Sequence, residues 1–319
     1  MSEPQWWRSL RGDPAAFLLD ESEPGVIWRT LIELLGRPPD SPAAVRARVA
    51  SRERGTAAAL LAGQDPLGYW GSPATYGARW GGTAWHVLAL AQLGADPEDP
   101  RAALGAETLI EALQPRSAGF AAARNKQPST CFTAEVCAAL TRFGFGHHPR
   151  VREAVAWLSS RQAERGGWAC PDLRHLVSGG CPVTAVAVLR LVGDTPVVER
   201  RPLEVLRQHA ATWLVGLGLF LSGTAPAGWW SCAHPCLGRT DFLDAMAALA
   251  RSGWPAGPAL HAAMRRGLER QTGDGRWLQR GSVPFGERSG EPSRWLTLKA
   301  LVALAAYHGE AAADSGGAA

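Results

Sequence analysis

Lysine is nearly missing from this chain. Of 33 basic residues only Lys126 and Lys299 are lysines, so almost all of the positive charge comes from arginine. The arginines are scattered along the sequence, and the formal net charge is only +4. A protein that follows the phosphates of a nucleic acid needs a basic patch or stripe. We therefore expect no nucleic-acid partner.

Long apolar runs and targeting signals are missing as well. No apolar stretch approaches the roughly 18 residues of a membrane span, and residues 1–14 lack the charged-then-apolar pattern of a secretory signal. We therefore expect a cytoplasmic protein without an integral membrane segment. In that compartment the six cysteines are expected to be thiols or metal ligands rather than disulfides.

Tryptophan, by contrast, is abundant, with 14 in the chain. Several aromatic residues belong to a repeated pattern in which a glutamine stands six positions earlier, in the pairs Gln64/Trp70, Gln114/Phe120, Gln162/Trp168 and Gln271/Trp277. The pattern recurs about every 50 residues, and one gap of about two periods places a degenerate unit near residue 217. Such a period is typical of a fold built from repeated helical hairpins.

Each period contains two helical patterns. Amphipathic segments precede the glutamines, at 42–63, 100–113, 149–162, 202–217 and 257–271. Segments that are apolar almost all round follow the aromatics, at 82–94, 130–144, 181–193, 240–253 and 292–309. Helices apolar on every side are buried, and one-sided helices cover them. We predict an all-α fold, an α/α barrel or toroid with about five outer and five to six inner helices, to which 25–36 supplies the sixth inner helix.

The same patterns divide the chain into three parts. Residues 1–39 are predicted to form an N-terminal helical segment that packs on the barrel, and residues 40–308 to form the toroid. Residues 309–319 are small and polar and are predicted to be a disordered tail.

The glutamine–aromatic pairs resemble the QW repeats of the prenyltransferase and squalene–hopene cyclase superfamily, and the length resembles single-barrel bacterial members. The resemblance implies that each glutamine caps a neighbouring helix and that each aromatic stacks over the turn. The catalytic motifs of the superfamily are missing, however. No two aspartates are adjacent, which excludes both DxDD and DDxxD, and no cysteine has an aspartate two positions before it, as the D-x-C zinc motif requires. The resemblance therefore implies a fold and leaves the activity open.

Five cysteines lie in three consecutive loops that lead from an outer to an inner helix. In a ring of alternating antiparallel helices, all such loops lie at the same end of the barrel. We therefore predict a shared site of Cys131, Cys170 and Cys181, with Cys236 as the fourth ligand and Cys232 and His234 as alternatives. Thiolate and imidazole ligands in this number fit zinc, our preferred metal, or an iron–sulfur cluster.

Two other readings of these cysteines stay open. Free cysteine packs like a small hydrophobic residue, so the thiols can be core residues, as we expect for Cys137. A single nucleophilic cysteine paired with His234 or His86 is the third possibility.

Acid–base candidates lie at the same end of the predicted barrel. Glu135 follows Cys131 by one helical turn on an apolar inner segment, where a charge needs a partner or a shifted pKa. Asp241 and Asp244 lie three apart at the start of another inner segment, although acidic residues are also simply favourable in a first turn. We select Glu135, Asp241 and His234 as catalytic candidates.

The sequence thus favours a metal-dependent enzyme with a cysteine-rich site at the barrel mouth. Its partner is expected to be a small hydrophobic molecule, with isoprenoid-like compounds among the candidates, and cyclase, transferase and lyase chemistry all remain open. The alternatives are a non-catalytic metal- or ligand-binding protein, or an interaction module that uses the barrel end.

Overall fold

A computed structural model gives the structure of residues 5–113, 118–123, 126–164, 166–171, 177–223 and 225–307. Gln114 and the predicted tail at 309–319 lie outside these described residues. The fold is all-α, and in the described part the only strands are the short pair β1 (Trp277–Leu278) and β2 (Pro292–Ser293). None of the described helices has the length and apolar character that crossing a membrane requires.

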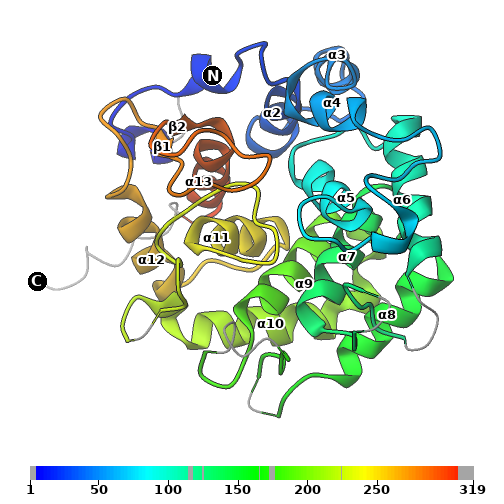
Figure 1. The fold of residues 1–319 in the computed structure, drawn as a ribbon. Helices are drawn as coiled ribbons and strands as arrows, with labels where there is room; N and C mark the ends of the chain where they lie inside the picture. The colour runs from blue at the N-terminus through cyan, green and yellow to red at the C-terminus, as the bar shows by residue number, and fades with distance from the viewer. Residues whose placement is uncertain are drawn as a thin grey trace, which may run out of the picture.

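Six inner helical segments form a ring (Figure 1). They are α2 (Pro24–Arg29) with the π-helical turn η2 (Thr30–Leu34), α5 (Thr83–Gln92), α7 (Thr130–Arg142), α9 (Pro182–Asp194), α11 (Phe242–Arg251) and α13 (Arg294–Tyr307). Helix α7 packs on α5 and α9, α11 packs on α9 and α13, and α13 packs on α2 and η2. The ring closes where Gly25 of α2 lies against the backbone of Leu93 and Gly94, directly after α5.

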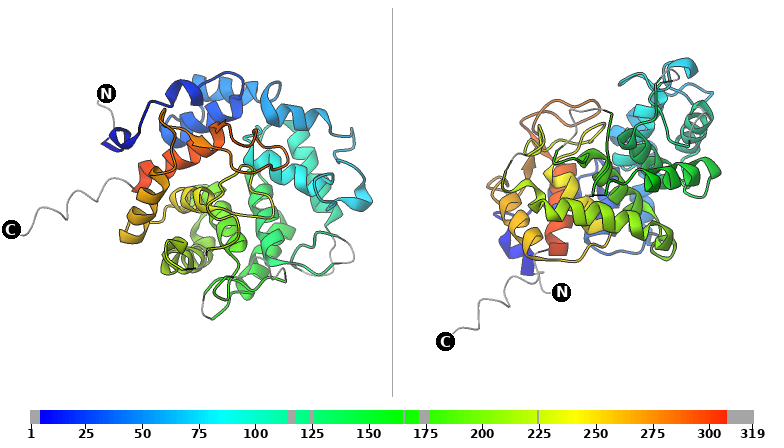
Figure 2. Two further views of the ribbon diagram at one scale, coloured as in Figure 1. Left: turned by 60° about the vertical axis from the view of Figure 1, so that its left-hand side comes forward. Right: turned by 90° about the horizontal axis from the view of Figure 1, so that it is seen from below.

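Outer helices surround this ring (Figure 2). They are α3 (Pro42–Ala50), α4 (Gly55–Ala62), α6 (Pro100–Ala112), α8 (Pro149–Ser160), α10 (Glu204–Gly216) and α12 (Pro258–Leu268). Four of them begin with proline in the first turn, where the fixed φ of proline suits a helix and its missing N–H costs nothing. The predicted all-α ring of inner and outer helices is therefore confirmed.

Short elements connect and extend the ring. Helix α1 (Ala15–Leu18) packs on α13, so the N-terminal segment contributes both α1 outside the ring and α2 within it. The others are the 3-10 turns η1 (Gln5–Ser9), η3 (Pro73–Thr75), η5 (Val197–Glu199), η6 (Arg201–Leu203) and η7 (Gly218–Phe220).

Four buried tryptophans make equivalent hydrogen bonds around the ring. The indole N–H of each donates to a carbonyl ten residues earlier: Trp70 to Leu60 at 3.0 Å, Trp168 to Leu158 at 2.9 Å, Trp229 to Leu219 at 3.1 Å and Trp277 to Gly267 at 3.1 Å. Trp229 belongs to the region where the sequence predicted a degenerate unit. Each indole therefore fixes the turn between the end of an outer segment and the next inner helix.

The glutamines of the pattern make less uniform contacts. Gln64 donates to the carbonyl of Arg101 in the neighbouring helix α6 at 2.9 Å. Gln271 accepts from the backbone N–H of Arg11 at 2.8 Å and donates to the carbonyl of Ser9 at 3.2 Å. The last glutamine therefore attaches the start of the chain to the end of the ring.

Candidate functional site

The interior of the ring is charged. Inner helices that are otherwise apolar carry ionisable side chains that lie in or next to the cavities of the ring: Arg29, Glu33, Glu135, Arg142, Arg190, Asp194, Asp244, Arg251 and Lys299. A buried charge is costly unless it is paired, and each of these makes at least one ion pair. The interior is therefore suited to polar as well as apolar groups of a ligand.

A central loop, residues 232–240, enters the ring before α11 (Figure 1). Gln92 of α5 holds it from both sides: the Cys236 N–H donates to Gln92 Oε1 at 2.9 Å, and Gln92 Nε2 donates to the Cys236 carbonyl at 2.7 Å. The N–H of Gly238 donates to Glu135 of α7 at 2.9 Å. Gln279 makes a similar reciprocal pair with the backbone of His234. These bonds fix the loop among helices that are far apart in the sequence.

A buried ion-pair network lies against this loop. Lys299 Nζ is 2.8 Å from Asp244 Oδ1, while Arg190 is 3.9 Å from Asp244 and 3.6 Å from Glu135. The hydroxyl of Thr240 donates to Asp244 at 3.0 Å. Burial alone would raise the pKa of Asp244, but Lys299 and Arg190 outweigh it and hold this pKa well below its ordinary value of 3.8. Asp244 is therefore an anion at neutral pH.

The two predicted catalytic carboxylates, Asp241 and Glu135, bind other groups of the protein. Asp241 is the N-cap of α11 and accepts from the Asp244 N–H at 3.0 Å. Its other oxygen accepts from the Ala233 N–H at 2.9 Å and from the Cys236 thiol at 3.4 Å. Burial raises the pKa of Asp241. Glu135, as described, contacts Gly238 and Arg190. Both side chains thus position the central loop, and their catalytic roles stay predictions.

His234 differs from these carboxylates in having a free ring nitrogen. The side chain is almost completely buried, stacks on Trp295 with ring centroids 5.0 Å apart, and has Nε2 3.1 Å from the carbonyl of Gln92. A carbonyl only accepts, so we assign the proton to Nε2 and the lone pair to Nδ1. Nδ1 is buried, and none of the described residues makes a hydrogen bond with it. Burial, with Lys299, lowers the pKa of His234 well below 6.5, so the imidazole is neutral at pH 7.

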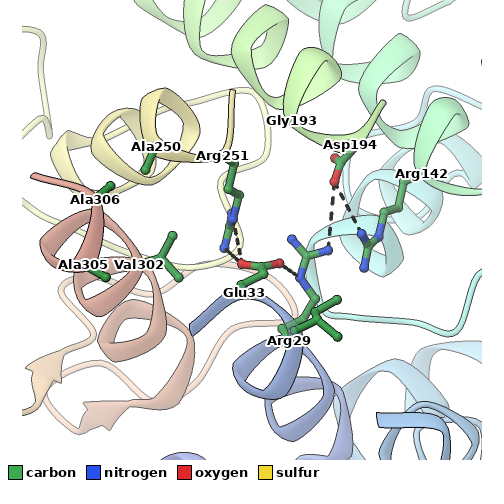
Figure 3. A pocket seen from close by; sticks show the side chains of 11 residues that line it. Arg29, Glu33, Arg142, Gly193, Asp194, Ala250, Arg251, Val302, Ala305 and Ala306 are labelled. Atoms are coloured by element: carbon green, nitrogen blue, oxygen red, sulfur yellow. Dashed lines mark hydrogen bonds and ion pairs between the residues drawn. The ribbon is translucent and has the colours of Figure 1, made fainter. Parts of the chain in front are cut away.

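A pocket opens into the ring at the other end of the inner helices. The last turns of α7, α9, α11 and α13, together with α2 and η2, surround a cavity of about 500 Å³ (Figure 3). A smaller cavity of about 40 Å³, lined in part by His234 and Lys299, shares Arg29, Asp194 and Arg251 with it. The two cavities are therefore neighbours, and His234 lines the smaller one.

Three arginines in this pocket share two carboxylates (Figure 3). Arg251 binds Glu33 through two nitrogens at 2.7 and 2.8 Å, and Arg29 pairs with the same carboxylate. Asp194 is 3.5 Å from Arg142 and 4.0 Å from Arg29. Burial and the neighbouring Arg142 lower the pKa of Arg29 to about 10. Positive charge is therefore in excess among the side chains of the pocket.

The structure brings three of the four predicted cysteine ligands together. Cys131, Cys170 and Cys181 form a buried cluster with Val183, and the Sγ atoms of Cys131 and Cys170 are 3.5 Å apart. Contacts with Cys170 and Cys181, and then burial, raise the pKa of Cys131, so without a bound cation it is a neutral thiol.

The fourth predicted ligand lies elsewhere. The Sγ of Cys236 is 3.1 Å from the Ala233 carbonyl and 3.9 Å from Lys299. Cys232 and Cys137 are buried in the main hydrophobic core. Across the described ranges, no three His, Cys, Asp or Glu side chains are arranged so as to hold a metal ion. A zinc or iron–sulfur site therefore stays a prediction.

Sequence reasoning missed most of the charged residues that line the pocket and the smaller cavities of the ring. Arg29, Arg142, Arg190 and Arg251 were not singled out, and Lys299 was noted only as a rare residue type. The available signal was the same for all of them: each is a charged residue within or at the end of an inner segment that is otherwise apolar.

Comparison with known proteins adds little to this picture. No family model matches the sequence, and no curated protein matches it. Among solved structures, the apo type II terpene cyclase MstE from Scytonema is similar with a TM-score of 0.45 and 20% sequence identity, over 89% of this chain and 86% of that chain.

Proposed function

We propose that the chain is an enzyme that binds a small, largely hydrophobic molecule in the pocket at the C-terminal ends of the inner helices. The observation that carries this proposal is the buried Nδ1 of His234, which accepts no hydrogen bond from the described residues, in a side chain that lines a small cavity next to the pocket. A neutral imidazole with an available lone pair can accept a proton as a general base, although the lowered pKa of His234 makes it a weaker base than a free imidazole. Proton abstraction, as in a lyase or in the last step of a cyclase, is the chemistry that this arrangement favours.

The pocket walls support the hydrophobic part of the proposal. Ile32, Ala250, Val302, Ala305 and Ala306 present apolar surface beside the charged groups, and the volume lies within the roughly 300–1,000 Å³ of small-molecule sites. An isoprenoid-like compound with a polar group matches both features. This pocket opens at the opposite end of the inner helices from the cysteines, so the proposed substrate site is not at the cysteine-rich end.

Filling the pocket is expected to abolish binding while the fold survives. Ala306 is exposed at the pocket rim, so Ala306→Trp is expected to change the free energy of unfolding by less than about 0.5 kcal/mol. Thermal shifts with a panel of isoprenoid alcohols, acids and phosphates provide the measurement. Ala59→Trp, on the exposed face of α4, is the control that keeps binding. Equal binding by both variants would remove the pocket as the substrate site.

The cysteine cluster carries a separate proposal of a bound thiophilic metal, which requires its thiols to move closer together, because the described residues hold no preformed set of three metal ligands. Three sulfurs from separate segments meet near the starts of α7 and α9, and thiolates are preferred zinc ligands. Elemental analysis of protein purified without a metal-affinity tag is expected to find about one zinc per chain. Cys131→Ser and Cys181→Ser are expected to lose it, and Cys137→Ser to retain it. A folded, metal-free wild type would instead leave three packed thiols.

A further inference from the structure

Arg142 is the least satisfied cation of the pocket. Its Nη1 lies 3.5 Å from Asp194, at the limit of a hydrogen bond. Its Nε and Nη2 are buried and have no hydrogen-bond partner among the residues that the structure describes. These two nitrogens form one edge of the planar guanidinium, and their N–H groups point in parallel. That edge matches the two oxygens of a carboxylate or phosphate.

The described surroundings hold Arg142 in place and provide no anion for it besides Asp194. Its guanidinium lies over the ring of Trp28, 4.9 Å from the centroid. Glu33 is already bound by Arg251 and Arg29, and Asp194 is shared between Arg142 and Arg29. Among the described residues of the pocket, three arginines thus share two carboxylates, which leaves this edge of Arg142 without an anion.

The dipoles of the inner helices offer another explanation for the arginines of the pocket. The last turns of four inner helices meet at this pocket, and their carbonyl ends carry partial negative charge that favours arginine there. This accounts for why basic side chains are found at the pocket. It does not satisfy the Nε and Nη2 donors of Arg142, because no carbonyl in the described part of the chain accepts from them. An unsatisfied edge on a buried charged group is costly, and a bound oxyanion would relieve it.

We propose that the pocket contains an oxyanion subsite in which the Nε/Nη2 edge of Arg142 binds the carboxylate or phosphate group of an amphiphilic ligand. The hydrocarbon part of that ligand lies against Val302, Ala305 and Ala306. This inference rests on the pocket of the proposed function and names its substrate class, an anionic amphiphile. It does not depend on His234 or on turnover.

Binding of four decyl compounds by isothermal titration tests the subsite. Decanoate and decyl phosphate are expected to bind the wild-type chain, and decanol and decyltrimethylammonium to bind much more weakly. Arg142→Gln is expected to weaken anion binding by about 10- to 100-fold, as the loss of a charged hydrogen-bond pair predicts. Arg142→Lys, which retains the charge without the paired edge, is expected to lose part of this affinity. The tighter of the two anions identifies the group.

Arg207→Gln is the matched control. Arg207 also pairs with a carboxylate, Glu204, and lies over a tryptophan ring, Trp254, but it is on the outer helix α10. Its variant is expected to bind both anions like the wild type.

Three results would overturn the subsite: decanol binding as tightly as decanoate, the ammonium compound binding best, or no loss of affinity in Arg142→Lys and Arg142→Gln. If Arg142→Gln fails to fold, Arg142→Lys decides alone. Anion binding without turnover would reject the proposed enzyme and keep the subsite. Turnover of a neutral substrate that does not depend on Arg142 would keep the proposed enzyme and reject the subsite.

Discussion

Replacing Asp244 by alanine is expected to destabilise the protein by about 3–5 kcal/mol. Asp244 is the carboxylate that neutralises Lys299, at 2.8 Å, and it also faces Arg190. Both cations are almost completely buried, so removing Asp244 leaves uncompensated charge next to the central loop. Urea denaturation followed by tryptophan fluorescence and circular dichroism measures the loss.

A partly exposed ion pair on an outer helix is the control for this prediction. Glu204 pairs with Arg207 on the outer surface, and Glu204→Ala is expected to cost less than about 1 kcal/mol. Replacing both partners, in Asp244→Leu with Lys299→Met, is expected to restore part of the stability because no lone charge remains. A cost for Asp244→Ala as small as that for Glu204→Ala would contradict a buried network that holds the loop.

The pH dependence of stability tests the role of Asp244 independently. The pKa of Asp244 is lowered in the folded state, and the folded protein therefore holds its anion more tightly than the unfolded chain does. Its contribution to stability is present above its ordinary pKa of 3.8 and is lost as the pH falls below that value. The difference in stability between the wild type and Asp244→Ala is therefore expected to shrink in acid.

The ring could be predicted from the sequence because it follows from local patterns. Three local patterns identify each helical hairpin: an inner segment that is apolar on all sides, an amphipathic segment that covers it, and an aromatic residue at a fixed period. The hairpins then repeat along the chain. Trp229 illustrates the reach of this reasoning, because it makes the same indole bond as Trp70 although its unit is degenerate. The convergence of Cys131 with Cys170 also follows from topology, since outer-to-inner loops lie at one end.

The pocket could not be predicted in the same way. Arg29, Glu33 and Arg251 come from both ends of the chain, and their pairing depends on how the ring closes. The sequence placed Cys236 with the other cysteines because its loop starts at their end of the barrel. It does not reveal how deeply that loop enters the ring, where Gln92 binds Cys236. Depth along a barrel axis is a property of side-chain packing rather than of periodicity.

Replacing His234 by glutamine is expected to lower kcat/KM by about 100- to 10,000-fold on a substrate that the pocket accepts, which is the usual contribution of a general base. Glutamine can retain the donor toward the carbonyl of Gln92 while it removes the free Nδ1. Turnover assays with the compounds that bind in the pocket measure the effect. His209→Gln is the control, because His209 also has Nε2 bonded to a carbonyl and a ring against a tryptophan, but on α10.

The same substitution has an expected effect that needs no substrate. The pKa of folded His234 is lowered by burial and by Lys299, with Asp244 and Arg251 also nearby. Below the ordinary value of 6.5 the unfolded chain therefore binds a proton that the folded protein excludes, and stability falls as the pH falls. Between about pH 7.5 and about pH 5.5 the wild type is expected to lose about 1 kcal/mol more than His234→Gln does.

Together the two readouts separate the competing functions. If His234→Gln loses both the pH dependence of stability and turnover, His234 is a buried neutral base that acts on the substrate. If His234→Gln loses the pH dependence of stability but keeps its turnover, the imidazole is neutral in the folded protein but takes no part in the reaction. An unchanged pH dependence would mean that folded His234 accepts a proton as readily as the unfolded chain does. The pocket would then be better explained as the binding site of a non-catalytic protein.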